Sequence, residues 1–430
     1  MLLEFSLTNF RSYRTKQTFT MAAAPRLGKR QNVFRSGVKG EVLPGLLKVA
    51  AIYGPNASGK SGLLAAMEAV VSVLRREPSN AGAPLPAKPF RFDSTLANEP
   101  SEFELHFIQN EMRYEYILGL TKDRIVRESL TSYPKGRERH LFDRVVQDNK
   151  EIYNFGDLEG GKDLHSVWQK LTGPKTAFLA QAVANSSEEL HQLREPLKWL
   201  TESVLLVNQD TMRSWSLASR KLIKQYPDLV KDFTEFFQEV DVPITDINVE
   251  DIAQDDDGLI LNVESGLVSK EESTFFGNKT TLTHTTALGN AEFDFSEESG
   301  GTQNLIGFWL PWMTMTDSLR GPYKVILVDE LDSSLHPEIV SALIHKHIAS
   351  NSTAQLIFTT HDTHLMKERL LRRDQFWITD RDKDGATSLF SIHDFRGREG
   401  EDVEKRYFEG RYRGLPVIRR EQKVLKAERT

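Results

Sequence analysis

The chain has 430 residues, of which 39% are hydrophobic and 27% charged. This composition is typical of a globular protein of about two to three domains and argues against a disordered or fibrous chain. The formal net charge of -6 argues against a nucleic-acid binder that is basic throughout, although a local basic patch stays open, and the lack of cysteine excludes disulfides, thiolate metal sites and cysteine nucleophiles.

No targeting or membrane segment is evident. The N-terminus lacks the apolar run and small-residue cleavage site of a secretory signal. No stretch approaches the ~18–20 apolar residues that a membrane-spanning helix needs, and residues 305–315 are interrupted by Gly307 and Pro311. We therefore expect a soluble, cytoplasmic protein that does not contact a membrane.

The N-terminal part predicts a strand, a loop and a helix. Residues 2–10 alternate between apolar and polar side chains as a strand does, and a polar, basic stretch with turn residues follows up to Lys48. Residues 49–53 are an apolar run typical of a buried parallel strand, and residues 61–74 carry apolar side chains at helical spacing. Residues 1–80 are therefore predicted to form the N-terminal lobe of an α/β domain.

The middle of the chain, residues 81–290, has a mixed pattern. Residues 76–101 predict a loop, the segments 102–108 and 113–120 alternate like paired strands, and residues 124–132 can add a third strand. From about 160 to 240 the spacing of apolar residues, Val204 included, predicts helices. Residues 241–298 are polar and acidic, with a turn at residues 255–258. We interpret 81–290 as a long α+β insertion.

Strand, helix and strand alternate again after the insertion. The pattern covers residues 323–328, 337–349 and 355–358 and is typical of a parallel α/β sheet. Residues 376–379 and 387–392 predict a hairpin. Residues 291–395 are therefore predicted to form the C-terminal lobe, and residues 396–430 a basic and aromatic tail.

The strongest functional motif is a phosphate-binding loop. The sequence GPNASGKS matches G-x-x-x-x-G-K-[ST] in full and stands between the predicted buried strand and helix. Backbone N–H groups in such a loop surround the phosphates, with Lys60 at the β- and γ-phosphates and Ser61 on Mg²⁺. The motif predicts ATP as the ligand. The predicted nucleotide-binding residues are Gly54, Pro55, Asn56, Ala57, Ser58, Gly59, Lys60, Ser61 and Gly62.

Two adjacent carboxylates follow the apolar run 325–328. Asp329 and Glu330 would stand at the C-terminal end of a strand, where ligands bind in open α/β sheets. We predict that Asp329 completes the Mg²⁺ site and that Glu330 orients or deprotonates the attacking water. An acidic strand end is the alternative for this segment alone, but its combination with the phosphate loop favours catalysis.

A third motif resembles the signature of ABC-type ATPases. It comprises Ser299, Gly300, Gly301, Thr302 and Gln303, directly before an apolar helical run. Glycines at a helix N-terminus make an anion site, although a simple helix cap would carry the same residues. The resemblance implies that this signature closes over the γ-phosphate bound to a second subunit. Asp332 likewise resembles a D-loop residue, and His361 resembles the switch histidine that senses the γ-phosphate.

The pattern DELDSSLHP at residues 329–337 is similar to ATPases of the SMC, RecF and OLD-like group. Arg11 and Ser12 resemble the first-strand motif of SMC and RecF heads. Residues 403–416 resemble the tail of short bacterial defence-associated, abortive-infection (RloA-like) ATPases of the AAA family, with a simple packing tail as the alternative. The resemblance implies an α/β fold: an ABC-type P-loop domain with a long insertion between the phosphate loop and the signature. The chain departs from the family pattern because it lacks a clear Q-loop glutamine. Residues 90–93 occupy the place in the sequence where that glutamine is expected.

The sequence argues against calcium and zinc sites. The residues Asp380, Asp382, Asp384 and Gly385 imitate the start of an EF-hand loop, but Ser391 stands where a glutamate is needed, so we interpret a β-turn. The remaining candidate histidines show no metal-ligand spacing with supporting carboxylates; they are His284, His336, His345, His347 and His364.

The leading hypothesis is an ATP hydrolase that works as a nucleotide-driven switch in a homodimer or higher homo-oligomer held by sandwiched ATP. The resemblance implies control of an effector encoded nearby, an RloB-like or TOPRIM-type nuclease, in bacterial anti-phage defence, with a nucleic-acid contact left open. The alternatives are a RecF-like DNA-repair ATPase and a nucleotide-gated scaffold with little hydrolysis. An importer or exporter ATPase fits the motifs less well. An intrinsic nuclease is disfavoured because, after His361, no second cluster of Glu and Asp residues stands on strand ends of the kind that a TOPRIM domain needs for two metals.

Overall fold

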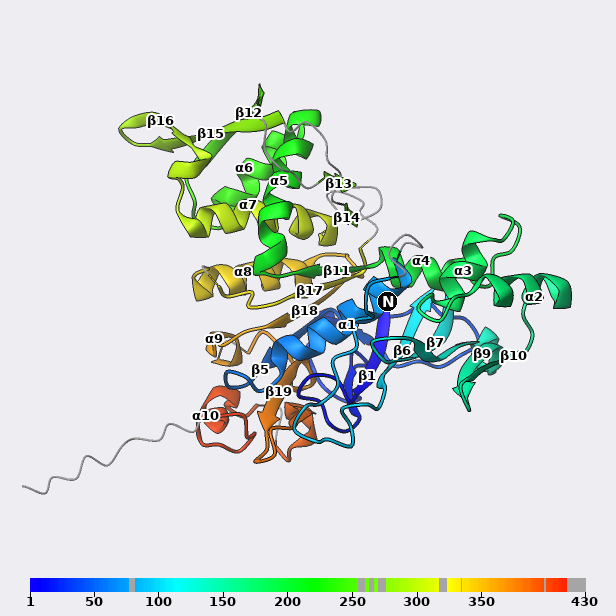
Figure 1. Cartoon of the computed structure of the whole chain (residues 1–430). Coiled ribbons are helices and arrows are strands. Elements are labelled where there is room, and N and C mark those ends of the chain that lie inside the picture. The colour runs from blue at the N-terminus through cyan, green and yellow to red at the C-terminus, as the bar shows by residue number, and fades with distance from the viewer. Residues whose placement is uncertain are drawn as a thin grey trace, which may run out of the picture.

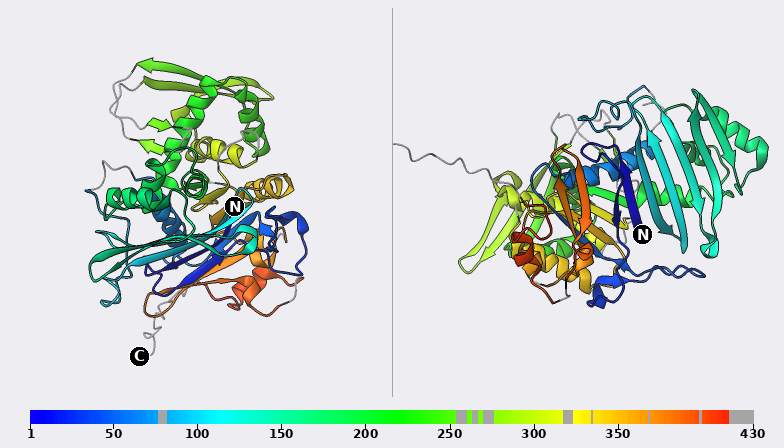
Figure 2. Two further views of the ribbon diagram at one scale, coloured as in Figure 1. Left: turned by 90° about the vertical axis from the view of Figure 1, so that its right-hand side faces the viewer. Right: turned by 90° about the horizontal axis from the view of Figure 1, so that it is seen from below.

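The computed structural model of the protein describes residues 1–76, 82–253, 260–262, 267–269, 276–316, 323–333, 335–367, 369–397 and 400–415. Two large sheets organise these residues, one antiparallel and one mostly parallel, with helices between and outside them (Figures 1 and 2). The turn at residues 255–258, Ser334 in the DELDSSLHP pattern, and residues 416–430 of the tail lie outside the described residues.

The six-stranded sheet carries the predicted α/β pattern. Its order is β11 (Val204–Val207), β17 (Val325–Val328), β18 (Gln355–Thr359), β5 (Val49–Tyr53), β19 (Phe376–Arg381) and β20 (Thr387–Ser391). All neighbours are parallel except β19 and β20, which form the predicted hairpin. The helical interpretation of Val204 was wrong: it begins an edge strand, because its backbone pairs with Val325 of β17.

Alternate residues of the parallel strands face two separate cores, as the two-residue period of a strand requires. Ala50 and Ile52 of β5 belong to the core shared with α1 (Lys60–Leu74) and the antiparallel sheet. Val49, Ala51 and Tyr53 belong to the other core. That core is completed by three helices on the opposite face: α5 (Gln209–Gln225), α7 (Gly300–Met315) and α8 (Pro337–Ala349). Helices α1 and α7 therefore lie on opposite faces of the parallel sheet.

The seven-stranded sheet is antiparallel throughout. Its order is β10 (Lys150–Phe155), β9 (Arg139–Gln147), β8 (Ile125–Ser132), β7 (Met112–Leu120), β6 (Ser101–Gln109), β1 (Leu2–Thr8) and β2 (Gln17–Thr20). The four strands predicted at 2–10, 102–108, 113–120 and 124–132 are confirmed. The stretch up to Lys48, which suggested only turns, also contains β2, β3 (Val33–Phe34) and β4 (Leu46–Leu47). Strands from 81–290 thus join both sheets, and the domain boundaries stay a prediction.

The remaining elements lie outside the two large sheets. They are α2 (Gly161–Leu171), α3 (Phe178–Ala184), α4 (Arg194–Glu202), α6 (Leu229–Glu239), β12 (Ile244–Ala253), β13 (Ile260–Asn262), β14 (Leu267–Ser269), β15 (Phe276–Thr286), β16 (Gly289–Asp294), α9 (His364–Lys367) and α10 (Val403–Phe408). Strands β12, β15 and β16 form a third, antiparallel sheet above α5 and α6 (Figure 1). Within the described residues, no helix combines the length and apolarity needed to cross a membrane.

A buried carboxylate fixes α3 to the antiparallel sheet. Glu128 of β8 is fully buried and accepts hydrogen bonds from the backbone N–H groups of Phe178 (2.6 Å) and Leu179 (2.9 Å) at the start of α3. The equally buried Arg144 of β9 forms an ion pair with it at 3.7 Å. Burial raises the pKa of Glu128, and the Arg144 guanidinium opposes that rise.

Candidate nucleotide-binding site

The predicted phosphate loop connects β5 to α1 at the edge where the parallel strands end. Gly54 and Gly59 have φ values of 149° and 110°, in a region that glycine adopts without strain. A Cβ atom on Gly54 would overlap with Thr379 of β19, and one on Gly59 would overlap with Thr387 of β20. The hairpin β19–β20 therefore packs against the loop so closely that both positions require glycine.

Hydroxyl groups of the hairpin hold the loop in place. Ser58 Oγ and Thr379 Oγ1 are 2.5 Å apart, and Thr387 Oγ1 donates to the Ser58 carbonyl at 2.8 Å. The Thr387 N–H donates to the carbonyl of Ser12 at 2.7 Å, which places one of the two first-strand residues beside the loop. Neither threonine was expected from the sequence, because no motif connects the hairpin with the loop.

Lys60 and Ser61 lie in the first turn of α1. The buried Lys60 Nζ donates to the carbonyls of Gly54 (2.9 Å) and Pro55 (3.3 Å), which holds its ammonium group inside the curve of the loop. Burial lowers the pKa of Lys60, while the carboxylate of Asp329 opposes this shift. Helix N-termini present unpaired N–H groups that attract anions. Together these groups form a positively polarised cradle of the kind that phosphates bind.

Asp329 and Glu330 follow β17 next to this cradle. Ser61 Oγ donates to Asp329 Oδ1 at 3.0 Å across 268 residues of sequence, so the predicted Mg²⁺ ligands lie in direct contact. Thr359 Oγ1, at the end of β18, donates to the same oxygen at 2.6 Å and accepts from the Glu330 N–H at 2.7 Å. Gln209 Nε2 donates to Glu330 Oε2 at 3.3 Å.

The backbone at Glu330 is unusual. Its φ of 55° lies in the left-handed region, which costs a residue with a side chain about 1 kcal/mol or more. The bond from its N–H to Thr359 stabilises this conformation. Thr359 and Gln209 were both missed from the sequence: a threonine ending a strand and a glutamine beginning a helix are common, and only the fold brings them to the carboxylates.

Asp332 and His361 meet at the same edge of the sheet. The His361 N–H donates to Asp332 Oδ2 at 3.3 Å, and the imidazole is exposed. Asp332 Oδ1 is buried and has no hydrogen-bond partner within the described residues. The two residues that resemble the D-loop and the switch histidine are therefore adjacent, and their roles stay predictions.

The predicted signature, unlike the residues described above, does not lie at the phosphate loop of its own chain. Ser299 is the N-cap of α7, with its Oγ accepting from the Thr302 N–H at 3.2 Å, and Gln303 Nε2 donates to the carbonyl of Glu298 at 3.0 Å. A Cβ on Gly300 would meet no atom within 4 Å, so this helix end is open. Helix α7 lies on the face opposite α1, although both helices begin on the left side of the molecule in Figure 1. The chain thus does not bring the signature to its own phosphate loop.

The described part of the tail packs beside the phosphate loop. Tyr407 of α10 and Tyr412 are buried in the core that contains Tyr53, and the Tyr407 hydroxyl donates to the Gly414 carbonyl at 2.8 Å. A Cβ on Gly414 would lie 3.9 Å from the Cα of Gly54. Near His361, Thr363 Oγ1 donates to Glu404 Oε1 of α10 at 2.9 Å.

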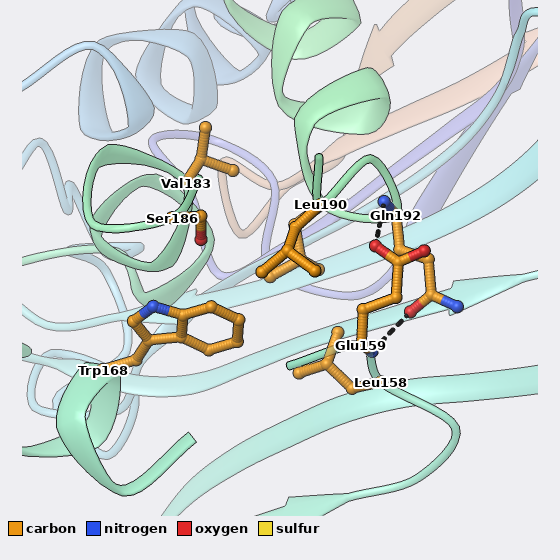
Figure 3. A pocket seen from close by; sticks show the side chains of 8 residues that line it. Leu158, Glu159, Trp168, Val183, Ser186, Leu190 and Gln192 are labelled. Atoms are coloured by element: carbon orange, nitrogen blue, oxygen red, sulfur yellow. Dashed lines mark hydrogen bonds between the residues drawn. The ribbon is translucent and has the colours of Figure 1, made fainter. Parts of the chain in front are cut away.

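Two other candidates carry no comparable chemistry. The small pocket between α2, α3 and α4 in Figure 3 is lined mostly by apolar side chains such as Trp168 and Leu190, and its Glu159 carboxylate already accepts from the backbone of Gln192. In the acidic turn, Asp382 Oδ1 accepts from the N–H of Ala386 at 2.8 Å, and Gly385 has φ of 82°. The predicted β-turn is confirmed.

A phosphate loop between β5 and α1, joined to a carboxylate pair on a parallel sheet, defines a P-loop nucleotide-binding protein of the α/β class. The predicted fold class is confirmed. The chain belongs to the family described as "AAA domain, putative AbiEii toxin, Type IV TA system", whose model matches residues 49–367. It is therefore an AAA-type ATPase by family.

Several solved structures are similar to this chain at low sequence identity. The SMC head domain from Thermotoga maritima is 15% identical, with 91% of this chain and 98% of that chain covered and a TM-score of 0.39. An SMC head bound to the C-winged helix domain of ScpA is 14% identical, with 91% and 97% covered and a TM-score of 0.43. A head with an extended coiled coil, bound to the C-terminal domain of ScpA from Pyrococcus furiosus, is 13% identical, with 91% and 96% covered and a TM-score of 0.39. No curated protein matches the sequence.

Proposed function

We propose that this chain hydrolyses ATP to ADP and phosphate and uses the reaction as a switch in a homodimer or higher homo-oligomer. The observation that carries the proposal is the junction at which Ser61, Asp329, Thr359 and Glu330 meet. A hydroxyl and a carboxylate oxygen 3.0 Å apart fit two ligand positions of one Mg²⁺, and the second carboxylate stands next to them. This is the arrangement that phosphoryl transfer to water requires.

Each residue of the junction has a defined task in this mechanism. Lys60 and the N–H groups of residues 54–62 bind the phosphates, and Ser61 and Asp329 hold Mg²⁺, which would neutralise charge on the β- and γ-phosphates. Glu330 orients the attacking water and accepts its proton, with Gln209 fixing one carboxylate oxygen. His361 contacts the γ-phosphate, and Asp332 positions the histidine through its backbone N–H.

The opposite placement of α1 and α7 supports the proposed dimer. The parallel sheet separates the signature from the phosphate loop of the same chain, while both helix N-termini lie on one side of the molecule (Figure 1). A second protomer related by a two-fold axis presents its signature to the loop of the first, and the reverse contact forms by symmetry. Ser299 to Gln303 then close over the γ-phosphate in trans, so that ATP holds two protomers together.

The switch acts on a partner protein. We infer an effector of the TOPRIM nuclease type in anti-phage defence. Support comes from the family description, which names a toxin of a toxin–antitoxin system, and from the docking of the tail beside the nucleotide site. Movement of the phosphate loop or of the switch histidine would change the contacts of α10, which offers a route from the nucleotide to a bound effector.

Mixing two inactive variants tests both hydrolysis and the dimer. Lys60→Ala removes phosphate binding in one protomer, and Ser299→Arg blocks the exposed signature in the other. In a mixed two-fold dimer, one of the two sites combines the intact Lys60 of one protomer with the intact Ser299 of the other. Half of the dimers formed by random mixing are of this kind, so about a quarter of the wild-type sites should be restored. Ser187→Arg, which adds the same charge at a remote exposed position, should stay fully active. Phosphate release is the readout.

The alternatives predict other results. No recovery on mixing, with both single variants inactive, would contradict a site shared between protomers. If the wild type and Glu330→Gln hydrolyse ATP equally slowly while ATP still drives dimerisation, the chain is a nucleotide-gated scaffold. ATP-dependent DNA binding that weakens with salt would instead favour a RecF-like repair role. Mass measurement of Glu330→Gln with and without ATP reports the assembly directly.

A further inference from the structure

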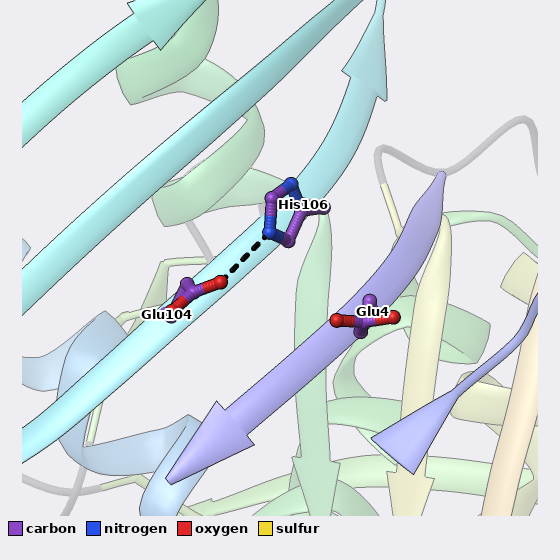
Figure 4. Close-up of side chains that lie close together, drawn as sticks. All are labelled: Glu4, Glu104 and His106. Carbon is purple, nitrogen blue, oxygen red and sulfur yellow. Dashed lines mark hydrogen bonds and ion pairs between the residues drawn. The ribbon is translucent and has the colours of Figure 1, made fainter. Parts of the chain in front are cut away.

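A cluster of potential metal ligands lies on the outer face of the antiparallel sheet, away from the nucleotide site. It comprises Glu4 of β1 and Glu104 and His106 of β6 (Figure 4). The register places Glu4 directly opposite His106, and Glu104 stands two residues from His106 on the same face of its strand. The intervening residues Phe5 and Leu105 are buried in the core. The three polar side chains therefore share one face by the geometry of the sheet itself.

The distances match a metal site. The potential ligand atoms all lie within 4.8 Å of one another, and His106 Nε2 is 3.0 Å from Glu104 Oε1. Ligand atoms at about 2.0–2.1 Å from a tetrahedral Zn²⁺ are about 3.3 Å apart. Small rotamer changes of Glu4 would close the remaining gap, because its backbone partner is already His106.

The negative charges in this cluster favour the binding of a cation. Two carboxylates stand close together, and Lys16 Nζ forms an ion pair with Glu104 Oε2 at 2.7 Å. Within the described residues, Glu4 has no hydrogen-bond or ion-pair partner for its carboxylate. Like charges at this separation repel unless a cation lies between them. Lys16 is more than half exposed and can move away when another cation binds.

We propose that Glu4, Glu104 and His106 bind a Zn²⁺ ion, with water at the fourth position. Imidazole nitrogen and carboxylate oxygen are ligands that Zn²⁺ accepts in tetrahedral sites, and the chain contains no thiolate that could compete for it. The ion connects β1 to β6. Strand β1 leads into Tyr13, whose hydroxyl donates to the Gly59 carbonyl at 3.0 Å, so the ion stabilises the lobe that supports the phosphate loop.

The histidines weighed for zinc from the sequence alone did not include His106. Glu104 stands two residues before it on the same strand, but Glu4 comes from a strand about a hundred residues earlier, so spacing along the chain gives no signal for the full set of ligands. By contrast, His284 pairs with the carboxylate of Glu298 at 2.7 Å, and within the described residues it belongs to no group of three potential ligands. Two donors hold Zn²⁺ weakly, which makes His284 a matched control.

The test is a Zn²⁺ titration of the chelator-treated full chain by calorimetry, with saturating Mg²⁺ to occupy the nucleotide site. We expect one equivalent to bind the wild type and His284→Gln, and Glu4→Gln and His106→Gln to bind at least about tenfold more weakly. Lys16→Met removes the competing ammonium group and should bind Zn²⁺ more tightly than the wild type. Replacement with Co²⁺ should give the intense visible absorption of a four-coordinate site.

Circular dichroism first establishes that each variant is folded. If a ligand variant does not fold, Lys16→Met decides, because it removes no ligand. The proposal is overturned if the wild type takes up no Zn²⁺, if Glu4→Gln and His106→Gln retain the full equivalent, or if Lys16→Met leaves the affinity unchanged. None of these outcomes depends on ATP hydrolysis, so the zinc site and the proposed function can fail separately.

Discussion

Thr359→Val tests the role of the residue whose side chain is hydrogen-bonded to both acidic residues of the site. The Thr359 hydroxyl donates to Asp329 Oδ1 at 2.6 Å and accepts from the Glu330 N–H at 2.7 Å, and the side chain is fully buried. Valine has nearly the same shape and the same preference for a strand. The substitution therefore removes two hydrogen bonds and leaves the packing of β18 almost unchanged.

The expected losses follow from those two bonds. A buried hydrogen bond contributes about 0.5–1.5 kcal/mol, and one to a charged group about 1.5–3 kcal/mol, so the free energy of unfolding should fall by about 2–4 kcal/mol. The Glu330 backbone, at φ of 55°, also loses the contact that stabilises it. If about 1.4–2.8 kcal/mol of this stabilisation is lost in the transition state of ATP hydrolysis, kcat falls about ten- to hundredfold.

Phosphate release under saturating ATP measures kcat, and urea unfolding measures stability. Thr234→Val is the matched control, because Thr234 of α6 is also buried and donates only to the Lys231 carbonyl within its own helix. That variant should keep the wild-type kcat. A Thr359→Val protein that hydrolyses ATP at the wild-type rate would refute the idea that this hydroxyl positions the carboxylates.

Three further results are expected. Gly54→Ala should abolish nucleotide binding in an equilibrium assay because its Cβ overlaps with the hairpin, whereas Gly161→Ala, at φ of 73° with open space around it, should bind normally. Glu128→Gln removes one of the two carboxylates paired with the buried Arg144, which keeps its ion pair with Glu151 at 3.0 Å, and should lower the urea stability by about 1.5–3 kcal/mol; an unchanged midpoint would contradict this. Burial lowers the pKa of His347 to about 4, with nearby Lys48 as a smaller cause. On acidification the imidazole is therefore protonated in the unfolded chain at a higher pH than in the folded chain. Stability should be complete above about pH 6.5 and fall by up to about 1.4 kcal/mol per pH unit down to about pH 4, and His347→Gln should flatten that profile.

The nucleotide motifs could be predicted because their chemistry is local. The phosphate loop needs eight consecutive residues with a strand before and a helix after, and both flanks have clear periodicity. The strands β17 and β18 are short apolar runs, so Asp329 and Glu330 could be placed at the end of one strand and His361 after the next. The contact between Ser61 and Asp329 agrees with the general rule that ligands bind at the C-terminal ends of parallel strands.

What could not be predicted depends on register and on the packing of distant elements. The four residues from Val204 to Val207 carry no period that separates a strand from a helix, and only pairing with β17 decides. Thr379 and Thr387 contact the phosphate loop because a hairpin more than three hundred residues away packs there. Glu4 and His106 meet through a cross-strand register that includes an irregularity near Leu2. Such contacts are set by the assembled sheet.

The neighbours of β5 have a consequence for synthesis. Within the part of the chain that the structure describes, this apolar strand, directly before the phosphate loop, pairs only with β18 and β19. The Thr379 side chain that donates to the Tyr53 carbonyl is 326 residues away from it. A ribosome must translate about three hundred further residues before either partner exists. Until then the nascent chain carries an unpaired, aggregation-prone segment, since non-local strand pairing is slow and leaves apolar edges exposed. Premature termination anywhere before residue 355 would release a polypeptide in which β5 has neither neighbour.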